Sequence, residues 1–224
     1  MPNILCIETS TTMCSVALCN ENEVIAFKEA NEGYTHAENL HVFIDEVLKQ
    51  SGIAKKDINA IAVGKGPGSY TGLRIGVSAA KGMAYALNIP LISVNTLFNM
   101  ALKVKQQFIQ KEVLFCPMLD ARRMEVYTAT YGRVLQDVTP TRALVIDENS
   151  VSQFEKSKHY IFFGDGMPKC KELLSKIPNA DFIENIFPSA ITMNEYAILQ
   201  YGNQKFENVA YFEPFYLKEF FTGK

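Results

Sequence analysis

The sequence carries no excess of charge of either sign. Its 224 residues contain 22 Lys and Arg against 24 Asp and Glu, which gives a formal net charge of −2 at pH 7. A chain with this balance has no overall field that would draw it to nucleic acid or to an anionic membrane. We therefore expect any nucleic acid that the protein serves to be held by another molecule.

The sequence also lacks a basic leader and an unbroken apolar segment long enough to span a membrane. The apolar run at the N-terminus is interrupted by Glu8 and by a cluster of Ser and Thr. Such a run is untypical of a signal peptide or a membrane span. We expect a cytoplasmic protein that does not associate with membranes.

Cysteine is sparse and shows no C-x-x-C spacing. The number of cysteines is odd, and most lie in apolar, strand-like runs: Cys6, Cys14, Cys19, Cys116 and Cys170. Cysteine in such runs behaves as a small hydrophobic residue. We predict reduced core thiols, and neither disulfides nor zinc ligands.

The remaining composition is typical of a folded α/β protein. Apolar residues make up 48% and charged residues 21% of the chain, which is ordinary globular usage. The length suits two small lobes better than one compact domain. We place an N-terminal lobe at residues 1–100 and a second lobe at 101–224, with the segment 189–224 packing back toward the first lobe.

Apolar residues follow strand-like spacing in some blocks and helix-like spacing in others. The N-terminal block and the block at Val113–Tyr131 both predict strand, polar turn and strand, so the second lobe would begin like the first. Further strands are expected at Val24–Lys28, Ile58–Val63, Pro90–Val94 and Tyr160–Phe163. Helices are expected at Thr35–Gln50, Thr71–Leu87, Thr96–Glu112, Met167–Lys176 and from Pro188 to Gln200.

A glycine-rich turn, GKGPGSYTGLRIG at Gly64–Gly76, joins a predicted strand to a predicted helix. It is not a Walker loop, because Lys65 is followed by glycine and not by Ser or Thr. It is not a dinucleotide fingerprint, because Ser69 stands where the third glycine is needed. Backbone amides at the start of the helix, with Lys65 and Arg74 nearby, could hold an anion. The alternative is that the glycines only permit a tight turn.

Other polar residues predict no catalytic group. His36 and His41 are separated by a rotation of roughly 140° on a helix, unlike the paired ligands of a zinc protease. We interpret them as a polar histidine at a helix start and a partly buried one, and we expect no metal. Ser69 lacks the nucleophile-elbow pattern and suits a helix cap. Asp120 and Asp165 follow strands, where carboxylates often bind metal or phosphate, yet each also suits a turn or a side-chain cap. For Asp120, which precedes two arginines, an ion pair or a hairpin function is favoured.

Five segments, taken in order, resemble the TsaB family, formerly called YeaZ. They are IETSTTMCSVAL at Ile7–Leu18, HAENLHVFIDEVL at His36–Leu48, GKGPGSYTGLRIGVSAAKGMAYAL at Gly64–Leu87, DARRMEVY at Asp120–Tyr127 and PFYLK at Pro214–Lys218. The resemblance runs nearly end to end, and GPGSYTGLRIG is its most specific part. It implies a two-lobed fold of the actin-like and sugar-kinase type, with mixed sheets flanked by helices.

The resemblance also implies a noncatalytic function. TsaB-like proteins pair with TsaD, which transfers a threonylcarbamoyl group to the adenosine beside the anticodon of tRNAs, and the ATPase TsaE joins them. A heterodimer with TsaD, a homodimer when the chain is alone, and contact with tRNA through the complex are thus implied. No catalytic residue and no cofactor of its own are implied, and ATP or ADP at the shared interface stays open.

The residues themselves favour an incomplete nucleotide cleft. Where an actin-like ATPase has a second glycine-rich phosphate loop, this chain has DARR at 120–123, whose side chains would crowd a phosphate. The first turn still offers hydroxyls that could touch a phosphate at a shared interface, from Thr9, Ser10, Thr11 and Thr12. The alternative is that this segment is a bare hairpin turn.

The partner surface is expected on the helices at His36–Leu48 and Thr71–Leu87, which in the family contact TsaD and also form a homodimer. On the first helix, Val42 and Phe43 lie beyond the predicted core-facing stripe. The second helix carries a seam of small residues and methionine: Gly76, Ala79, Ala80 and Met83. Such seams could form an exposed apolar patch. The alternative is that both are buried within the first lobe.

Two other functions stay open at this point. A small actin-like ATPase or kinase would bind and turn over ATP as an isolated chain. A metal-dependent glycoprotease, the older description of this family, would need His36 or His41 for cleavage.

Overall fold

A computed structural model of the chain describes residues 1–21, 23–33, 35–108 and 112–218. It divides into two compact units, one made of Met1–Thr96 with the described part of Pro188–Lys224, the other of Leu97–Phe187. The sequence places residues 189–224 in the second lobe as a segment that packs back toward the first. In the structure, the described residues from Pro188 onward instead belong to the first unit.

The first unit is built on a mixed five-stranded sheet in the order β3-β2-β1-β4-β5. Its strands are β1 (Ile4–Glu8), β2 (Cys14–Cys19), β3 (Val24–Ala30), β4 (Ala60–Gly66) and β5 (Leu91–Asn95). β1, β2 and β3 pair antiparallel, whereas β4 and β5 run parallel to β1. β1 lies at the centre, where Ile7 pairs with Val16 on one side and Val63 on the other.

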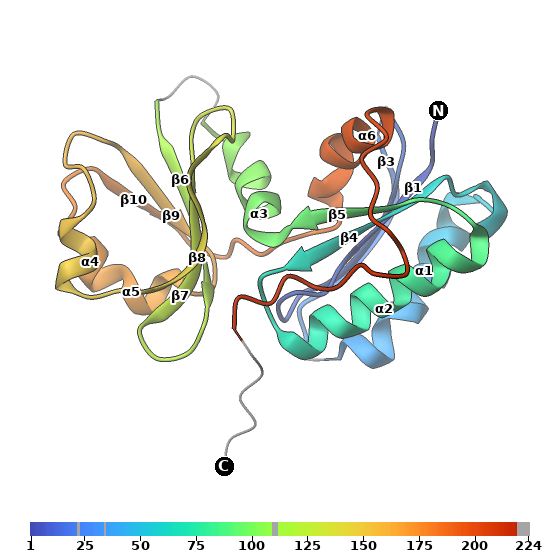
Figure 1. The fold of residues 1–224 in the computed structure, drawn as a ribbon, viewed down its shortest axis with the longest axis horizontal. Coiled ribbons are helices and arrows are strands. Elements are labelled where there is room, and N and C mark those ends of the chain that lie inside the picture. Colours follow the sequence, from blue (N-terminus) through green and yellow to red (C-terminus); the bar gives the residue numbers. More distant parts are fainter. Residues whose placement is uncertain (22, 34, 109–111, 219–224) are drawn as a thin grey trace, which may run out of the picture. The chain divides into compact units, whose positions relative to one another are not determined.

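Helices cover both faces of this sheet (Figure 1). They are α1 (His36–Ser51), the short 3-10 helices η1 (Lys55–Asp57) and η2 (Ile191–Met193), α2 (Tyr70–Leu87) and α6 (Asn194–Gly202). α1 and α2 lie side by side on one face, and α6 lies against the other. The main core of the unit fills the space between the sheet and the pair α1 and α2.

The second unit repeats this plan with a sheet in the order β10-β9-β6-β7-β8. Its strands are β6 (Leu114–Asp120), β7 (Glu125–Tyr131), β8 (Asp137–Val145), β9 (Tyr160–Phe163) and β10 (Ala180–Ile183). Its helices are α3 (Thr96–Lys105) on one face and α4 (Glu148–Ser152) and α5 (Met167–Leu174) on the other. The prediction of two mixed sheets flanked by helices is confirmed.

The local signals explain where elements begin and end. α2 starts at Ser69, whose hydroxyl accepts a hydrogen bond from the Gly72 amide, and ends at Asn88 in the left-handed conformation. α1 ends at Gly52, which is also left-handed. The interpretation of Ser69 as a helix cap is thus confirmed.

Several elements differ from the prediction. α3 ends at Lys105 and not at Glu112, and residues 109–111 of the predicted helix lie outside the described residues. The late helix starts at Asn194, after a 3-10 turn, and not at Pro188. β8, α4 and β10 carry no long apolar run, because each is short or half exposed, and the sequence pattern does not reveal them.

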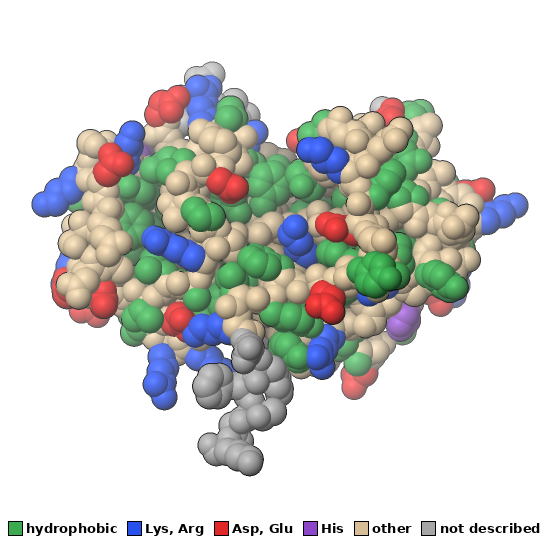
Figure 2. Space-filling view, in the orientation of Figure 1, with side chains coloured by type: hydrophobic (Ala, Val, Ile, Leu, Met, Phe, Trp, Pro, Cys, Tyr) green, Lys and Arg blue, Asp and Glu red, His purple; other side chains and the backbone are tan. Residues whose placement is uncertain are grey.

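The five cysteines are all buried and unpaired, as predicted. Their thiols lie in the interiors of the two units, on strands and on one helix. Within the described residues, no helix is long and apolar enough to cross a membrane. Charged side chains of both signs are scattered over the face seen in Figure 2.

Candidate partner-binding site

The loop between β1 and β2 is fixed against the start of α2 by polar contacts. Thr9 Oγ1 donates a hydrogen bond to the carbonyl oxygen of Gly72 at 2.8 Å, and the Ser69 amide donates to the carbonyl oxygen of Ser10 at 2.6 Å. Glycine is required for this approach, because a Cβ at Gly72 would lie 2.1 Å from the Thr9 carbonyl oxygen. At Gly76 it would lie 2.2 Å from Thr9 Oγ1. The glycines of the motif therefore allow close packing between two backbone segments.

Several polar groups of the loop are hydrogen-bonded within the chain itself. The Ser10 amide donates to Glu8 Oε1 at 2.8 Å, and the Met13 amide donates to Thr11 Oγ1 at 3.2 Å. Ser10 Oγ is an exception, a buried hydroxyl with no hydrogen-bond partner in the described residues. Thr9, Ser10 and Thr11 are buried and Thr12 is half-buried. A nucleotide contact by these four residues stays a prediction.

His36 closes the same junction from α1. Its Nε2 lies 2.7 Å from the carbonyl oxygen of Thr11, so this nitrogen carries the proton and donates. Burial lowers the pKa of His36, which keeps the ring neutral, and the hydrogen bond to Thr11 partly opposes that shift. The interpretation of His36 as the polar histidine and His41 as the partly buried one is wrong, because His36 is buried and His41 is exposed.

The predicted interface residues differ in exposure. Phe43 does not lie beyond the core-facing stripe of α1: it is 6% exposed and belongs to the core, whereas Val42 is 51% exposed. The spacing from Leu40 through Phe43 to Val47 matches the buried side of a helix, and the sequence already contained this signal. On α2, Gly76 and Ala80 are buried, whereas Ala79 and Met83 are half-buried. Contact of these residues with a partner stays a prediction.

The face of α2 turned to solvent carries a different stripe, which the sequence reasoning missed. It consists of Thr71, Arg74, Ser78, Gly82 and Tyr85, all exposed and spaced by three or four residues. A Cβ added at Gly82 would meet nothing within 4 Å, so the packing of this chain does not require glycine there. Small residues occur on both sides of α2, and helical spacing alone does not tell which side is buried.

A C-terminal strap, residues 207–216, runs along β5, β4 and α2. The Glu207 amide donates to the Leu91 carbonyl oxygen at 2.8 Å, which extends the edge of the sheet. Lys81 Nζ donates to the carbonyl oxygen of Phe212 at 2.7 Å, and the Phe215 amide donates to that of Lys65 at 2.7 Å. The strap therefore links the glycine-rich turn, α2 and the edge strand.

In the second unit, the ends of β6 and β9 bring Asp120 and Asp165 together. The Asp120 amide donates to Asp165 Oδ1 at 3.1 Å, and Asp120 Oδ1 accepts from Lys169 Nζ at 2.5 Å and from the Arg122 amide at 2.7 Å. The predicted ion-pair and turn functions of Asp120 are confirmed. Arg122 and Arg123 have φ of 71° and 45°, a left-handed turn that joins β6 to β7.

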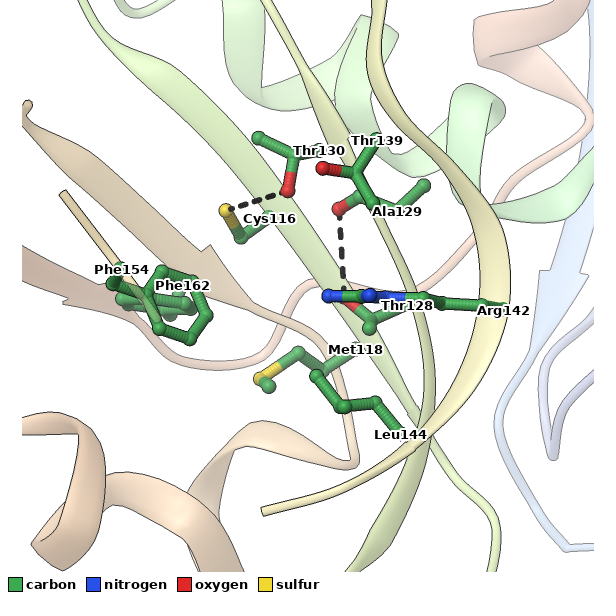
Figure 3. Close-up of a pocket in the computed structure, with 10 residues that line it drawn as sticks. All are labelled: Cys116, Met118, Thr128, Ala129, Thr130, Thr139, Arg142, Leu144, Phe154 and Phe162. Carbon is green, nitrogen blue, oxygen red and sulfur yellow. Dashed lines mark hydrogen bonds between the residues drawn. The ribbon is translucent and has the colours of Figure 1, made fainter. Parts of the chain in front are cut away.

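A small hollow lies on the face of β6, β7 and β8 (Figure 3). Thr128 Oγ1 donates to the Pro117 carbonyl oxygen at 2.8 Å, and Cys116 Sγ lies 3.8 Å from Thr130 Oγ1. Burial raises the pKa of Cys116 to about 12, so the thiol stays protonated. The Arg142 side chain extends from β8 toward Thr128 in this view. No candidate interface residue lines the hollow. The described part of the chain also holds no group of three His, Cys, Asp or Glu that could bind a metal ion.

Comparison with known proteins defines the class to which this fold belongs. The family model described as TsaD, tRNA N6-adenosine threonylcarbamoyltransferase, matches residues 30–211. The solved structure of YeaZ from Pseudomonas aeruginosa is similar over 97% of this chain and 100% of that chain, with a TM-score of 0.80 and 26% identity. The chain thus has the fold of YeaZ, with two units that are each a mixed five-stranded sheet flanked by helices, and it is related to the threonylcarbamoyltransferases.

Curated relatives specify the family more closely. The tRNA threonylcarbamoyladenosine biosynthesis protein TsaB of Bacillus subtilis is 32% identical over 78% of this chain and 76% of its own length. TsaB of Escherichia coli is 42% identical over 58% of this chain, a match that spans 55% of the E. coli protein. The chain belongs to the TsaB family of tRNA threonylcarbamoyladenosine biosynthesis proteins.

Proposed function

We propose that this chain is a noncatalytic subunit that stabilises and activates TsaD in the threonylcarbamoylation of the adenosine beside the anticodon of tRNAs. Membership of the TsaB family supports the pathway. The observation that carries the noncatalytic part is the packing of the β1–β2 loop on α2. The Thr9 hydroxyl, which could otherwise donate to a phosphate, donates to the Gly72 carbonyl oxygen and is therefore occupied within the fold.

The turn between β6 and β7 supports the same proposal. A phosphate-binding loop presents free backbone amides to its ligand, and glycine lets the ligand approach. Here the Arg122 amide is bonded to the Asp120 carboxylate, and Lys169 neutralises part of that carboxylate. Two arginine side chains follow at the position where glycine would be needed. This turn is built to stabilise a hairpin.

The proposed partner surface is the exposed side of α1 and α2. It combines Val42 on α1 with the stripe of Thr71, Arg74, Ser78, Gly82 and Tyr85 on α2. Large exposed side chains flank small ones on α2, so a partner helix could approach the backbone closely while Tyr85 covers its side. TsaD would bind here, a second copy would occupy the same face in its absence, and TsaE and tRNA would join through the complex.

Reconstitution tests the proposal. The chain would be mixed with TsaD, TsaE, the threonylcarbamoyl-adenylate synthase and unmodified tRNA from its own source, and modified adenosine would be measured by mass spectrometry. We expect modification to need this chain in a stoichiometric amount, since a subunit is not recycled as a catalyst is. Equal yield without the chain would contradict the proposal.

A second measurement addresses the alternative of an actin-like ATPase or kinase. The isolated chain would be assayed for ATP binding and turnover in the presence of magnesium. We expect less than one equivalent of bound ATP and no steady turnover, because Thr9 Oγ1 and the Arg122 amide are already hydrogen-bonded within the chain. Stoichiometric binding with steady turnover by the isolated chain would favour the enzyme instead.

A further inference from the structure

Arg74 on the exposed stripe of α2 is held in one position by two tyrosines. Its guanidinium donates a hydrogen bond to the Tyr70 hydroxyl and lies 4.2 Å from the centre of the Tyr70 ring. The Tyr216 ring, from the C-terminal strap, packs against Tyr70 with ring centres 4.6 Å apart. The pKa of Arg74 is raised, chiefly because its side chain forms a hydrogen bond with Tyr216. Residues from two distant parts of the chain thus fix one surface cation.

Fixing an arginine in this way has an energetic consequence for binding. A free arginine side chain carries roughly 2 kcal/mol of rotamer entropy, which a partner must normally restrict. Here the stacking and the two phenol contacts have already restricted it before any partner arrives. Arginine is also one of the residue types enriched at the energetic centres of interfaces.

Arg74 nevertheless has no anionic partner inside the described chain. The ion pairs found there involve other cations, among them Lys28 with Glu46 and Lys169 with Asp120, and none includes Arg74. The exposed guanidinium therefore keeps its charge without an ion pair. An arginine in this state is suited to a two-point hydrogen bond with a planar anion.

The surroundings favour a carboxylate over a phosphate. Phosphate sites at helix starts combine a cation with free backbone amides. At the start of α2, the Gly72 amide is bonded to Ser69 Oγ and the Ser69 amide to the Ser10 carbonyl oxygen. With these two amides already bonded, the guanidinium is the main binding group of the exposed stripe, and its planar fork matches the flat two-oxygen edge of an Asp or Glu side chain.

We infer that Arg74, stacked on the Tyr70 ring that packs in turn against Tyr216, is a preformed anchor for an Asp or Glu side chain of the partner protein that binds α2. This inference rests on the proposed function, in which that partner is TsaD. It also assigns a function to the C-terminal strap. The strap places Tyr216 against Tyr70, and this arrangement positions Arg74.

Binding measurements on neutral and charged variants test the anchor. The affinity for TsaD of the same source would be measured by titration calorimetry for the unaltered chain, Arg74→Met and Arg74→Lys. We expect Arg74→Met to weaken binding by about 10- to 100-fold. Arg74→Lys should recover only part of this loss, because an ammonium is a point charge without the planar fork. Arg142→Met, an exposed arginine of the second unit, is the matched control and should bind like the unaltered chain.

The outcomes separate this inference from the proposed function. If the unaltered chain binds TsaD and Arg74→Met binds within about two-fold of it, the anchor is wrong and the subunit function stands. If the unaltered chain does not bind TsaD, both are wrong. Far-ultraviolet circular dichroism and the melting temperature verify that each variant is folded. If Arg74→Met does not fold, the affinity of Arg74→Lys for TsaD decides between these outcomes.

A cross-linking experiment detects the carboxylate directly. A carbodiimide activates a carboxylate, and a neighbouring amine then displaces the urea to form an amide. In the complex with TsaD, the Arg74→Lys variant should yield a cross-linked peptide joining position 74 to an Asp or Glu of TsaD, which mass spectrometry would identify. The unaltered chain, whose guanidinium does not react in this way, is the control. Complexes that form but give no such peptide, together with undiminished affinity of Arg74→Met, would overturn the inference.

Discussion

Thr9 Oγ1 donates a hydrogen bond to the carbonyl oxygen of Gly72, 2.8 Å away, although 63 positions separate the two residues. The contact joins the loop after the first strand to the first turn of α2. A Cβ at position 72 would lie 2.1 Å from the Thr9 carbonyl oxygen, which is backbone and has little freedom to move. The junction therefore depends on the absence of a side chain on α2.

This junction predicts opposite effects for the same substitution at two glycines of one helix. Gly72→Ala should lower the free energy of unfolding by about 1–3 kcal/mol, because the clash outweighs the gain in helix propensity. Gly82→Ala should raise it by about 0.5–1 kcal/mol, because nothing lies within 4 Å of the added carbon. Urea denaturation followed by circular dichroism gives both values. Two changes of the same sign would show that propensity, and not packing, controls this helix.

Burial of His36 predicts that stability falls in mild acid. The folded pKa is lowered, so the unfolded chain takes up a proton at a higher pH than the folded chain does. The stabilising effect of the neutral ring is complete above the unfolded pKa of about 6.5 and is lost as the pH falls below it, by at most about 1.4 kcal/mol per pH unit.

Denaturation curves at several pH values between 5 and 8, a range of roughly 1.5 units on either side of the histidine pKa, check this slope. His36→Gln should flatten the slope, because the titrating group is gone. His41→Gln, at an exposed position of the same helix, is the control variant. A slope that survives His36→Gln would mean that other groups cause it.

The sequence pattern revealed the parts of the fold whose signal is local. The strand at Tyr160–Phe163 is a continuous buried run with glycine after it, and its predicted bounds are those of β9. The cap Ser69 was identified because side-chain and backbone rules act over three or four residues. β8 was missed because it is half exposed and contains Pro140, so its pairing with β7 depends on a neighbour distant from its own pattern.

The candidate site was harder to predict, because its contacts are long-range. Nothing near Gly72 in the sequence indicates that Thr9 packs on it, and nothing near Arg74 indicates that Tyr216 reaches it. The helix faces were also ambiguous on α2, where small residues lie on both sides. On α1 the signal was present, since Phe43 fits the buried spacing set by Leu40 and Val47, and the interpretation of Phe43 as an interface residue overlooked it.

The neighbours Val42 and Phe43 give a direct test of that correction. Phe43→Ala should lower the free energy of unfolding by about 3–4 kcal/mol, because it removes a ring that is 6% exposed from the core. Val42→Ala should change it by less than about 0.5 kcal/mol, because that side chain is half in solvent. Thermal and urea denaturation of the two variants measures the difference. Similar losses of stability at both positions would contradict the finding that Phe43, and not Val42, belongs to the core.

A long side chain at Gly82 should block the partner without harming the fold. Gly82 lies on the exposed stripe of α2 with nothing near its Cα, so Gly82→Gln should keep or slightly raise the melting temperature. If a partner helix packs on this stripe, the added side chain prevents close approach, and affinity for TsaD should fall by about 10-fold or more.

The matched control for this prediction is Gly202→Gln. Gly202 ends α6 and is also exposed, with nothing within 4 Å of an added Cβ. It lies on the helix against the opposite face of the sheet from α2 (Figure 1). Calorimetric titration of both variants with TsaD, beside the unaltered chain, compares the two sites. Loss of affinity at Gly202 together with full affinity at Gly82 would move the interface away from α2, because both substitutions add the same side chain at an exposed helix glycine.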